Sequence, residues 1–210
     1  MKIAVLGSGS WATALAKIVM NNVDEINWYI RKQETIDEFI ESRRNPNHLE
    51  WAYFDTNRIY FSTDINEVLD LSNTIILAIP SPYVKSCLDE INIDISNKKI
   101  ISAVKGMIPD ENTLVTDYIH EHFHVPHENI GVIAGPCHAE EIALERLSYL
   151  TIGGISEQNT RAWSELLTTR YVHVAQSNDV IGLEYSSVLK NIYAIAAGMC
   201  SSLRYGDNFQ

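Results

Sequence analysis

Cysteine is scarce in this chain, and its three cysteines are scattered. Cys87, Cys137 and Cys200 have no paired spacing. A disulfide framework or a zinc knuckle needs cysteines in closely spaced sets, so neither is expected. Four histidines lie in the stretch HEHFHVPH at residues 120–127 without acidic or cysteine ligands at useful spacing, and we interpret them as a solvated helix end. The sequence therefore predicts reduced thiols and no metal site.

Long apolar runs and positive charge are lacking as well. No apolar run comes near the roughly 20 residues of a membrane span, and too few apolar residues follow Met1 for a signal peptide. The chain has 16 Lys and Arg against 27 Asp and Glu, a formal net charge of −11. Binding to nucleic acid or anionic lipid without sequence preference needs an excess of positive charge. We therefore expect a cytoplasmic protein with no membrane span and no nucleic-acid partner.

The chain does have a regular alternation of short β-branched segments and longer helical patterns. Parallel strands need crossover connections, so this alternation predicts an α/β fold, a mostly parallel sheet with helices on both faces. From Asp179 to Gly198, apolar residues recur at helical spacing, which predicts a long helix that opens an all-helical second domain. The expected domains are residues 1–178 and 179–210. The expected strands are 2–6, 26–30, 58–61, 74–79, 99–104, 129–134 and 149–153, and the expected helices are 13–21, 33–42, 64–70, 83–91, 111–122 and 157–169.

Two glycines follow the first expected strand at once, in the pattern G-x-G-x-x-A formed by Gly7, Gly9 and Ala12. In a strand–turn–helix, the first glycine permits a tight turn and the second lets the backbone approach a pyrophosphate. The third, small residue lets helix and strand pack closely, and the helix presents free N–H groups to the phosphates. The pattern predicts a Rossmann-type dinucleotide-binding domain, with a plain structural turn as the alternative.

The second expected strand ends in cations. An Asp or Glu that binds the adenosine ribose is usual at this position, but the chain has Arg31 and Lys32 there. Two cations suit a 2′-phosphate, so we expect NADPH as cofactor, with NADH as a second cofactor or in its place. The alternative is that both residues belong to the solvated start of the next helix.

Further short motifs follow the later strands. Because ligands lie outside the carboxyl ends of parallel strands, these turns should face one crevice. With the early Ser10-Trp11-Ala12-Thr13-Ala14-Leu15-Ala16, the set resembles the bacterial type of NAD(P)-dependent glycerol-3-phosphate dehydrogenase over essentially the whole chain. The later motifs are Asn45-Pro46, Ala78-Ile79-Pro80-Ser81, Lys105-Gly106, Gly135-Pro136-Cys137-His138-Ala139-Glu140, Glu184, Leu189-Lys190-Asn191 and Gly206-Asp207-Asn208.

The resemblance implies hydride transfer between the nicotinamide and C2 of dihydroxyacetone phosphate, which gives glycerol 3-phosphate for phospholipid synthesis. Lys190 matches the family's proton-transferring lysine. The resemblance also implies a homodimer for the full-length form. Positions that match dinucleotide contacts are Ser10, Trp11, Arg31, Lys105 and Ala139, and positions that match substrate contacts are Lys105, Gly135, Cys137 and Lys190.

Ketone reduction needs such lysines for a chemical reason that does not depend on the resemblance. When hydride reaches a ketone carbon, negative charge develops on the oxygen, and a nearby ammonium stabilises it and donates the proton. We expect Lys190 to be the acid in reduction and the base in oxidation. Lys105 would orient the substrate, and a second cation nearby would lower a lysine's pKa. The alternatives are a surface lysine on a helix for Lys190 and a solvated turn residue for Lys105.

The sequence departs from the family pattern at two places. Cys137 stands where Ser or Thr is usual, and a thiol is the weaker hydrogen-bonding group, so either the backbone makes that contact or affinity is reduced. The chain also ends just beyond residues 206–208, where the family continues. We therefore expect a truncated chain that binds dinucleotide weakly and catalyses poorly or not at all.

Two other functions are compatible with part of the pattern. Reductases of the β-hydroxyacid dehydrogenase or ketopantoate reductase type share the early glycines and a later catalytic lysine, but not the remaining motifs. A dinucleotide-sensing module would bind cofactor without turnover. The segment from Asn45 to Trp51 either lies near the active site, as the family's matching loop does, or is an ordinary surface loop.

Overall fold

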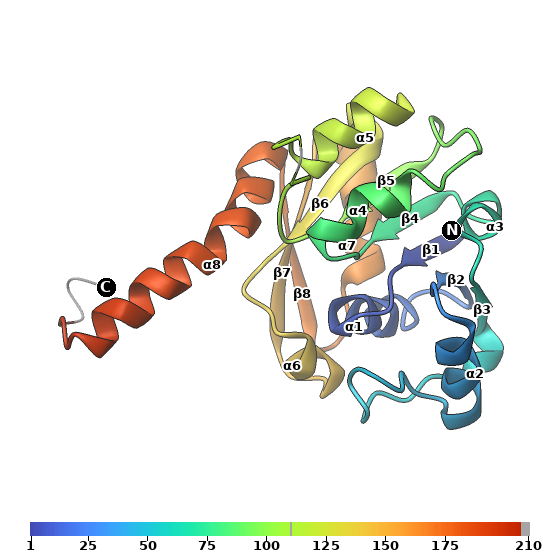
Figure 1. Ribbon diagram of the computed structural model, residues 1–210, viewed down its shortest axis with the longest axis horizontal. Helices are drawn as coiled ribbons and strands as arrows, with labels where there is room; N and C mark the ends of the chain where they lie inside the picture. The colour runs from blue at the N-terminus through green and yellow to red at the C-terminus, as the bar shows by residue number, and fades with distance from the viewer. Residues whose placement is uncertain (110, 207–210) are drawn as a thin grey trace.

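The computed structural model describes residues 1–109 and 111–206 (Figure 1). Within them, eight strands form one sheet in the order β3-β2-β1-β4-β5-β6-β7-β8. The strands are β1 (Ile3–Leu6), β2 (Ile26–Tyr29), β3 (Ile59–Ser62), β4 (Thr74–Leu77), β5 (Lys99–Ser102), β6 (Ile130–Ala134), β7 (Ser148–Gly154) and β8 (Val172–Ser177). The α-helices are α1 (Ser10–Val19), α2 (Gln33–Ser42), α3 (Ile65–Asp70), α4 (Ser81–Leu88), α5 (Val115–Phe123), α6 (Ala139–Ala143), α7 (Glu157–Leu167) and α8 (Val180–Ser202).

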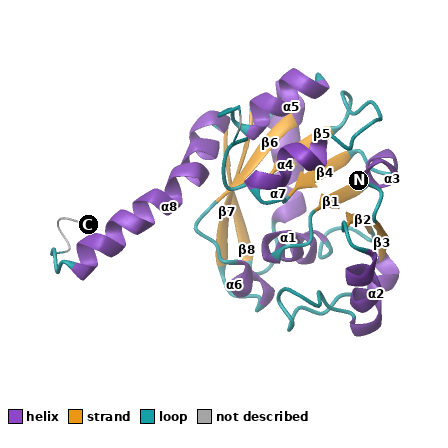
Figure 2. Ribbon diagram, in the orientation of Figure 1, coloured by secondary structure: helices purple, strands orange, loops and turns teal. Residues whose placement is uncertain are grey.

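The sheet is parallel except at one junction. Neighbouring strands run parallel in every pair but β6 and β7, which are antiparallel. The chain starts in the middle at β1, moves outward to β3, and returns to the other side of β1 with β4. Ligands of open α/β sheets bind where the strand order reverses, outside the carboxyl ends of the strands. The predicted α/β fold with a mostly parallel sheet is confirmed (Figure 2).

Each face of the sheet has its own hydrophobic core, because successive residues of a strand point to opposite faces. In β1, Ile3 and Val5 belong to one cluster of buried residues and Ala4 and Leu6 to the other. The first cluster includes residues of α1, α2, α6 and α7, and the second includes residues of α3, α4 and α5. Helices therefore cover both faces, as the alternating pattern predicts.

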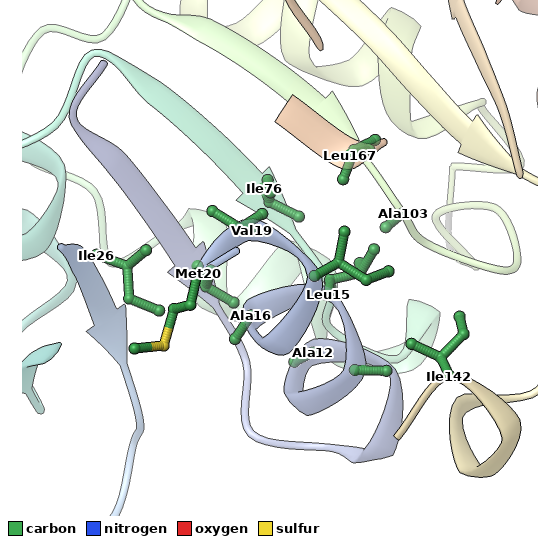
Figure 3. Packing of buried hydrophobic residues seen from close by; sticks show 14 of the residues in the cluster. Ala12, Leu15, Ala16, Val19, Met20, Ile26, Ile76, Ala103, Ile142 and Leu167 are labelled. Carbon is green, nitrogen blue, oxygen red and sulfur yellow. The ribbon is translucent and has the colours of Figure 1, made fainter. Parts of the chain in front are cut away.

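Helix α1 lies directly behind the glycine-rich turn and packs against the middle of the sheet. Ala12, Leu15 and Ala16 are fully buried, and Figure 3 shows them on the side of α1 that faces the strands. The small alanines let the helix approach the strands closely, as the third position of the glycine motif requires. Complete burial of a side chain such as Leu15 stabilises the fold by about 1.5–3 kcal/mol.

Helix α8 behaves differently from the rest of the chain. Its 23 residues include one that is buried, Glu184, and Figure 1 shows the helix extending away from the sheet. Its large apolar side chains are exposed, among them Ile181, Leu189 and Ile192. No helix in the described parts of the chain is both long and apolar enough to cross a lipid bilayer.

The structure corrects several element predictions. Strand β8 and the short helix α6 were not predicted, because their few residues do not repeat an apolar pattern long enough to stand out. Helix α5 begins at Val115 rather than at residue 111, because Asn112 adopts a left-handed φ of 51° and Ile108 forms an antiparallel bridge with Thr113. Of the late Gly-Asp-Asn motif, Asp207 and Asn208 lie outside the described residues.

Candidate active site

A pocket of about 260 Å³ lies at the point where the strand order reverses. Its walls are formed by the turns that follow β1, β2 and β4, by helix α4 and by His48 from the segment between α2 and β3. It therefore occupies the place where a Rossmann sheet binds its dinucleotide. Three of the expected cofactor residues line it, Gly7, Gly9 and Arg31. The other lining residues are Ser8, Tyr29, His48, Ile79, Pro80, Tyr83, Ser86, Cys87 and Glu90.

The glycine-rich turn is shaped to receive an anion. Gly7 has a φ of 116°, and a Cβ there would lie 3.1 Å from the carbonyl carbon of Ala78. A Cβ on Gly9 would meet no atom within 4 Å, so the space beside it is open. Gly9 caps α1 without a side-chain acceptor, and the first turn of α1 holds no acidic residue. The first N–H groups of α1 are thus available, at the positive end of the helix dipole, to a dinucleotide pyrophosphate, which fits this turn.

The segment between α2 and β3 is fastened to this turn. Asn45 is fully buried, and its Nδ2 donates to the carbonyl of Ser8 at 2.9 Å and to Oγ1 of Thr13 at 2.8 Å. Nδ1 of His48 lies 3.2 Å from Oγ of Ser10. Of the two interpretations of this segment, the structure favours a loop at the site. Sequence reasoning did not select Asn45 or His48 as site residues, although Asn-Pro was part of the family pattern.

The two cations that were expected after β2 lie in different places. Arg31 lines the pocket, whereas Lys32 is the exposed N-cap residue of α2 and is not among the lining residues. Beside Arg31, the Tyr29 hydroxyl donates to Oε2 of Glu90 at 3.4 Å. Burial, aided by the charge of Glu90, raises the pKa of the Cys87 thiol to about 12, and burial likewise raises the pKa of Tyr29. This end of the pocket therefore carries one cation and two neutral groups besides Glu90.

Lys105 joins three elements. It follows β5, its Nζ lies 4.6 Å from the centroid of the Trp11 ring at the start of α1, and it is within electrostatic range of Lys190 on α8. Partial desolvation is the main cause that lowers the pKa of Lys105, and the positive charge of Lys190 lowers it further. The turn behind it needs Gly106, whose φ is 153°. Of the residues that the sequence singled out, the structure thus places Lys105 against Trp11, with Lys190 close enough for its charge to act on Lys105.

The turn after β6 carries the other expected substrate positions. Gly135 has a φ of 147°, and a Cβ there would lie 2.8 Å from the carbonyl oxygen of Tyr149. Sγ of Cys137 is buried and donates to the same carbonyl at 2.9 Å. Burial raises the pKa of this thiol. Ala139 is buried at the start of α6. The side chain of Cys137 is therefore held by the protein, and the neighbouring backbone remains for contact with a ligand.

The histidine-rich stretch ends α5, as expected. The rings of His120 and His127 stack with centroids 3.8 Å apart, and His122 stacks on Tyr118. His124 closes the helix in a left-handed conformation. Within residues 1–109 and 111–206, no cluster of three or more His, Cys, Asp or Glu residues is arranged to hold a metal ion.

The strand order, the glycine turn and the pocket beside it define a dinucleotide-binding protein of the Rossmann class. Comparison with known families gives the particular branch. Residues 2–160 match the model of the NAD-dependent glycerol-3-phosphate dehydrogenase N-terminus, and residues 179–210 match that of its C-terminus. The chain belongs to the NAD-dependent glycerol-3-phosphate dehydrogenase family.

Individual relatives agree with this placement. The chain is 35% identical to "Glycerol-3-phosphate dehydrogenase [NAD(P)+]" of Exiguobacterium sp. and 33% identical to that of Bacillus pumilus, over 98% and 99% of this chain. Solved glycerol-3-phosphate dehydrogenases of Plasmodium falciparum and Coxiella burnetii are 29% and 26% identical, with TM-scores of 0.88 and 0.83 over 99% of this chain. The chain spans 61% and 60% of the two sequence relatives and 61% and 63% of the two structures.

Proposed function

We propose that this chain carries the cofactor-binding part of an enzyme that interconverts dihydroxyacetone phosphate and glycerol 3-phosphate with NADPH or NADH. The observation that carries the proposal is the contact of Lys105 with Trp11 next to the open glycine turn, with Lys190 near enough for its charge to act on Lys105. The family and the names of its relatives support the same reaction.

Lys190 is the proton-transferring residue in this proposal. Reduction of the ketone places negative charge on its oxygen, and an ammonium beside that oxygen stabilises the charge and then donates a proton. Lys190 does so in reduction and accepts the proton in oxidation. Lys105 orients the substrate, and desolvation together with the positive charge of Lys190 lowers its pKa. The nicotinamide supplies the hydride when it is bound. The protein positions the cofactor and the substrate and supplies the electrostatic field around them.

The cofactor is held by the turn and by the cations near it. Backbone N–H groups of α1 bind the pyrophosphate, and Arg31 meets the 2′-phosphate of NADPH from within the pocket. Lys32 adds positive charge from the start of α2 without lining the pocket. The proposed cofactor contacts are Gly7, Gly9, Ser10, Trp11, Ala12, Arg31, Lys32, Lys105 and Ala139.

The substrate lies between the two lysines and the turn after β6. Gly135 and the backbone at Cys137 contact it, because the thiol of Cys137 is engaged by the Tyr149 carbonyl. Residues 179–210 form the first part of a helical substrate-binding domain. We also propose a cytoplasmic location, a homodimer in the full-length form, and a role for the product in phospholipid synthesis.

The test follows NADPH absorbance after addition of dihydroxyacetone phosphate, in the longest form of the protein that the gene encodes. We expect rapid oxidation, which Lys190→Ala lowers by about 10²–10⁴-fold because the proton donor is removed. Lys2→Ala, on an exposed lysine that precedes β1 at the end of the strand opposite to the glycine turn, is the control and should leave the rate unchanged.

The same assay separates the alternatives. Oxidation with ketopantoate or a β-keto acid, and none with dihydroxyacetone phosphate, would assign the protein to another reductase branch. Cofactor binding that persists in Lys190→Ala, without turnover of any of these substrates by the unmodified protein, would indicate a dinucleotide sensor.

A further inference from the structure

Glu184 is the residue of α8 that the dinucleotide-binding part buries. Its side chain is fully buried, although neighbouring residues of the helix are partly or fully exposed. Its Oε1 accepts the backbone N–H of Val115 at 2.9 Å and that of Thr116 at 3.3 Å. Its Oε2 accepts the hydroxyl of Thr116. One carboxylate thus accepts three hydrogen bonds from the first turn of α5.

Helix α5 depends on this carboxylate for its cap. The first N–H groups of a helix need acceptors from outside its own ladder, and a Ser, Thr, Asp or Asn at the N-cap usually supplies one. The N-cap residue of α5 is Leu114, which makes no side-chain cap. A negative charge at this end is also favourable to the helix dipole. Glu184 therefore caps a helix of the dinucleotide-binding part from 68 residues further along the chain.

A second contact next to Glu184 fixes where α8 leaves the sheet. A Cβ on Gly153 of β7 would lie 2.6 Å from Cδ1 of Leu183 and 3.6 Å from Cα of Val180. The glycine therefore lets the first turn of α8 lie against the strand. Two adjacent residues, Leu183 and Glu184, hold the helix to the sheet and to α5. Beyond them, residues 191–199 of α8 are exposed.

Lys190 follows this anchor closely. It lies six positions after Glu184, or about 9 Å along the helix axis. A tilt of about 10° at the anchor would therefore move Lys190 by about 1.5 Å. A displacement of about 1 Å of a reacting group can lower a rate by about 100-fold.

We propose that Glu184 is a positioning residue, whose carboxylate clamps α8 to the first turn of α5 and thereby aims Lys190 at Lys105 and the substrate. The catalytic consequence rests on the proposed function. The clamp itself does not, and it acts through Lys190 without touching the reacting atoms.

The test compares Glu184→Ala with a matched cap variant on the same helix. Asp179→Ala removes a carboxylate that caps α8 itself and does not bind α5. Oδ1 of Asp179 accepts the backbone N–H of Gly182 at 2.8 Å. Glu184→Gln keeps one carbonyl acceptor and serves as the conservative variant. Thr116→Val removes the hydroxyl donor and gives a second way to weaken the clamp if Glu184→Ala does not fold.

The first readout is independent of turnover. The pKa of Lys105 is measured from the pH titration of its side-chain NMR signals, because desolvation and the charge of Lys190 lower it while Cys137 and Glu140 raise it. Lys190→Met provides the reference for loss of the neighbouring charge. We expect Glu184→Ala to raise the pKa of Lys105 toward that reference, Glu184→Gln and Thr116→Val to raise it less, and Asp179→Ala to leave it unchanged.

The second readout is kinetic, in the longest encoded form of the protein. Glu184→Ala should lower kcat by about 100-fold with little change in the KM for NADPH, and Glu184→Gln should recover part of the loss. If folded Glu184 variants titrate and turn over like Asp179→Ala, the residue has a structural role only and the proposal is wrong. A titration as expected in a protein without NADPH binding or turnover would support the clamp and refute the proposed function.

Discussion

Apolar side chains are buried in the central strands of the sheet and exposed on helix α8. Every residue of β1 and β4 is buried, whereas the one buried residue of α8 is an acid, Glu184. Residues such as Ile192 and Ile195 repeat at the spacing of a packed helix, yet both are 60% exposed. Burial is therefore set by what packs against a residue, and sequence hydrophobicity records only that a surface is suited to packing.

The largest expected contrast between the two regions is in stability. Leu15→Ala, in the core beneath α1, should lower the free energy of unfolding by about 2–5 kcal/mol because it leaves a cavity. Ile192→Ala on α8 should change it by less than about 0.5 kcal/mol, because the side chain is exposed. Urea unfolding of both variants measures the difference. Equal losses would show that α8 packs against the sheet in solution.

Glycine substitutions should have opposite signs in the two regions. Gly7→Ala should destabilise by about 1–3 kcal/mol, because the left-handed φ is strained for alanine and the methyl meets the Ala78 carbonyl. Gly198→Ala should stabilise by about 0.5–1 kcal/mol, because it lies within α8 with open space around it. Thermal unfolding of the two variants reports the signs. Stabilisation by Gly7→Ala would contradict the turn geometry.

Cofactor preference should depend on a cation in the pocket and not on a cation near the end of α8. Arg31→Ala should weaken NADPH binding by about 10-fold, roughly 1.4 kcal/mol, and leave NADH nearly unchanged, because only NADPH carries the 2′-phosphate. Arg204→Ala, an exposed residue just beyond α8, is the control. Fluorescence titration with both cofactors measures the ratio. Equal loss for NADPH and NADH would place Arg31 at another part of the dinucleotide.

The smallest expected effect is a pH dependence that Glu184 adds where the two regions meet. Burial raises the pKa of Glu184 above its ordinary 4.5. The native state then holds a proton that the unfolded chain has released, so stability falls as pH rises from 4.5 through the folded pKa. A tenfold difference in proton affinity between the folded and unfolded states corresponds to about 1.4 kcal/mol.

Unfolding of the unmodified protein and of Glu184→Gln across this range isolates the contribution of that residue. The stability of the unmodified protein relative to the variant should decrease as pH rises. Parallel curves would mean that the carboxyl has an ordinary pKa in the folded protein. Asp179→Asn, an exposed cap on the same helix, controls for loss of a surface charge.

Local signals predicted the sheet and the glycine turn well. Short β-branched apolar segments and the G-x-G-x-x-A pattern need only neighbouring residues, so β1, α1 and the open space at Gly9 follow from sequence. The predicted long helix from Asp179 onward is confirmed as α8, because its apolar period extends over many turns.

The remaining features depend on partners far along the chain. Asn45 reaches the glycine turn across 37 residues, and the thiol of Cys137, in the turn after β6, donates to the Tyr149 carbonyl of β7. Strand β8 is defined by its pairing with β7 rather than by its own residues. No local pattern indicates that Glu184 caps α5. Neither Leu114 nor the residues around Glu184 belong to a capping motif from which the partner segment could be identified.

The strand order also sets when each part of the site can form during synthesis. All lining residues of the cofactor pocket lie between Gly7 and Glu90, on β2 and on the segments that follow β1, β2 and β4. Strand β1 pairs directly with both β2 and β4. Lys190 follows Glu90 by 100 residues, or about 5–20 s at about 5–20 residues per second. A nascent chain can therefore assemble this pocket seconds before Lys190 exists, and cofactor captured in that interval would stabilise the sheet on which α8 later docks.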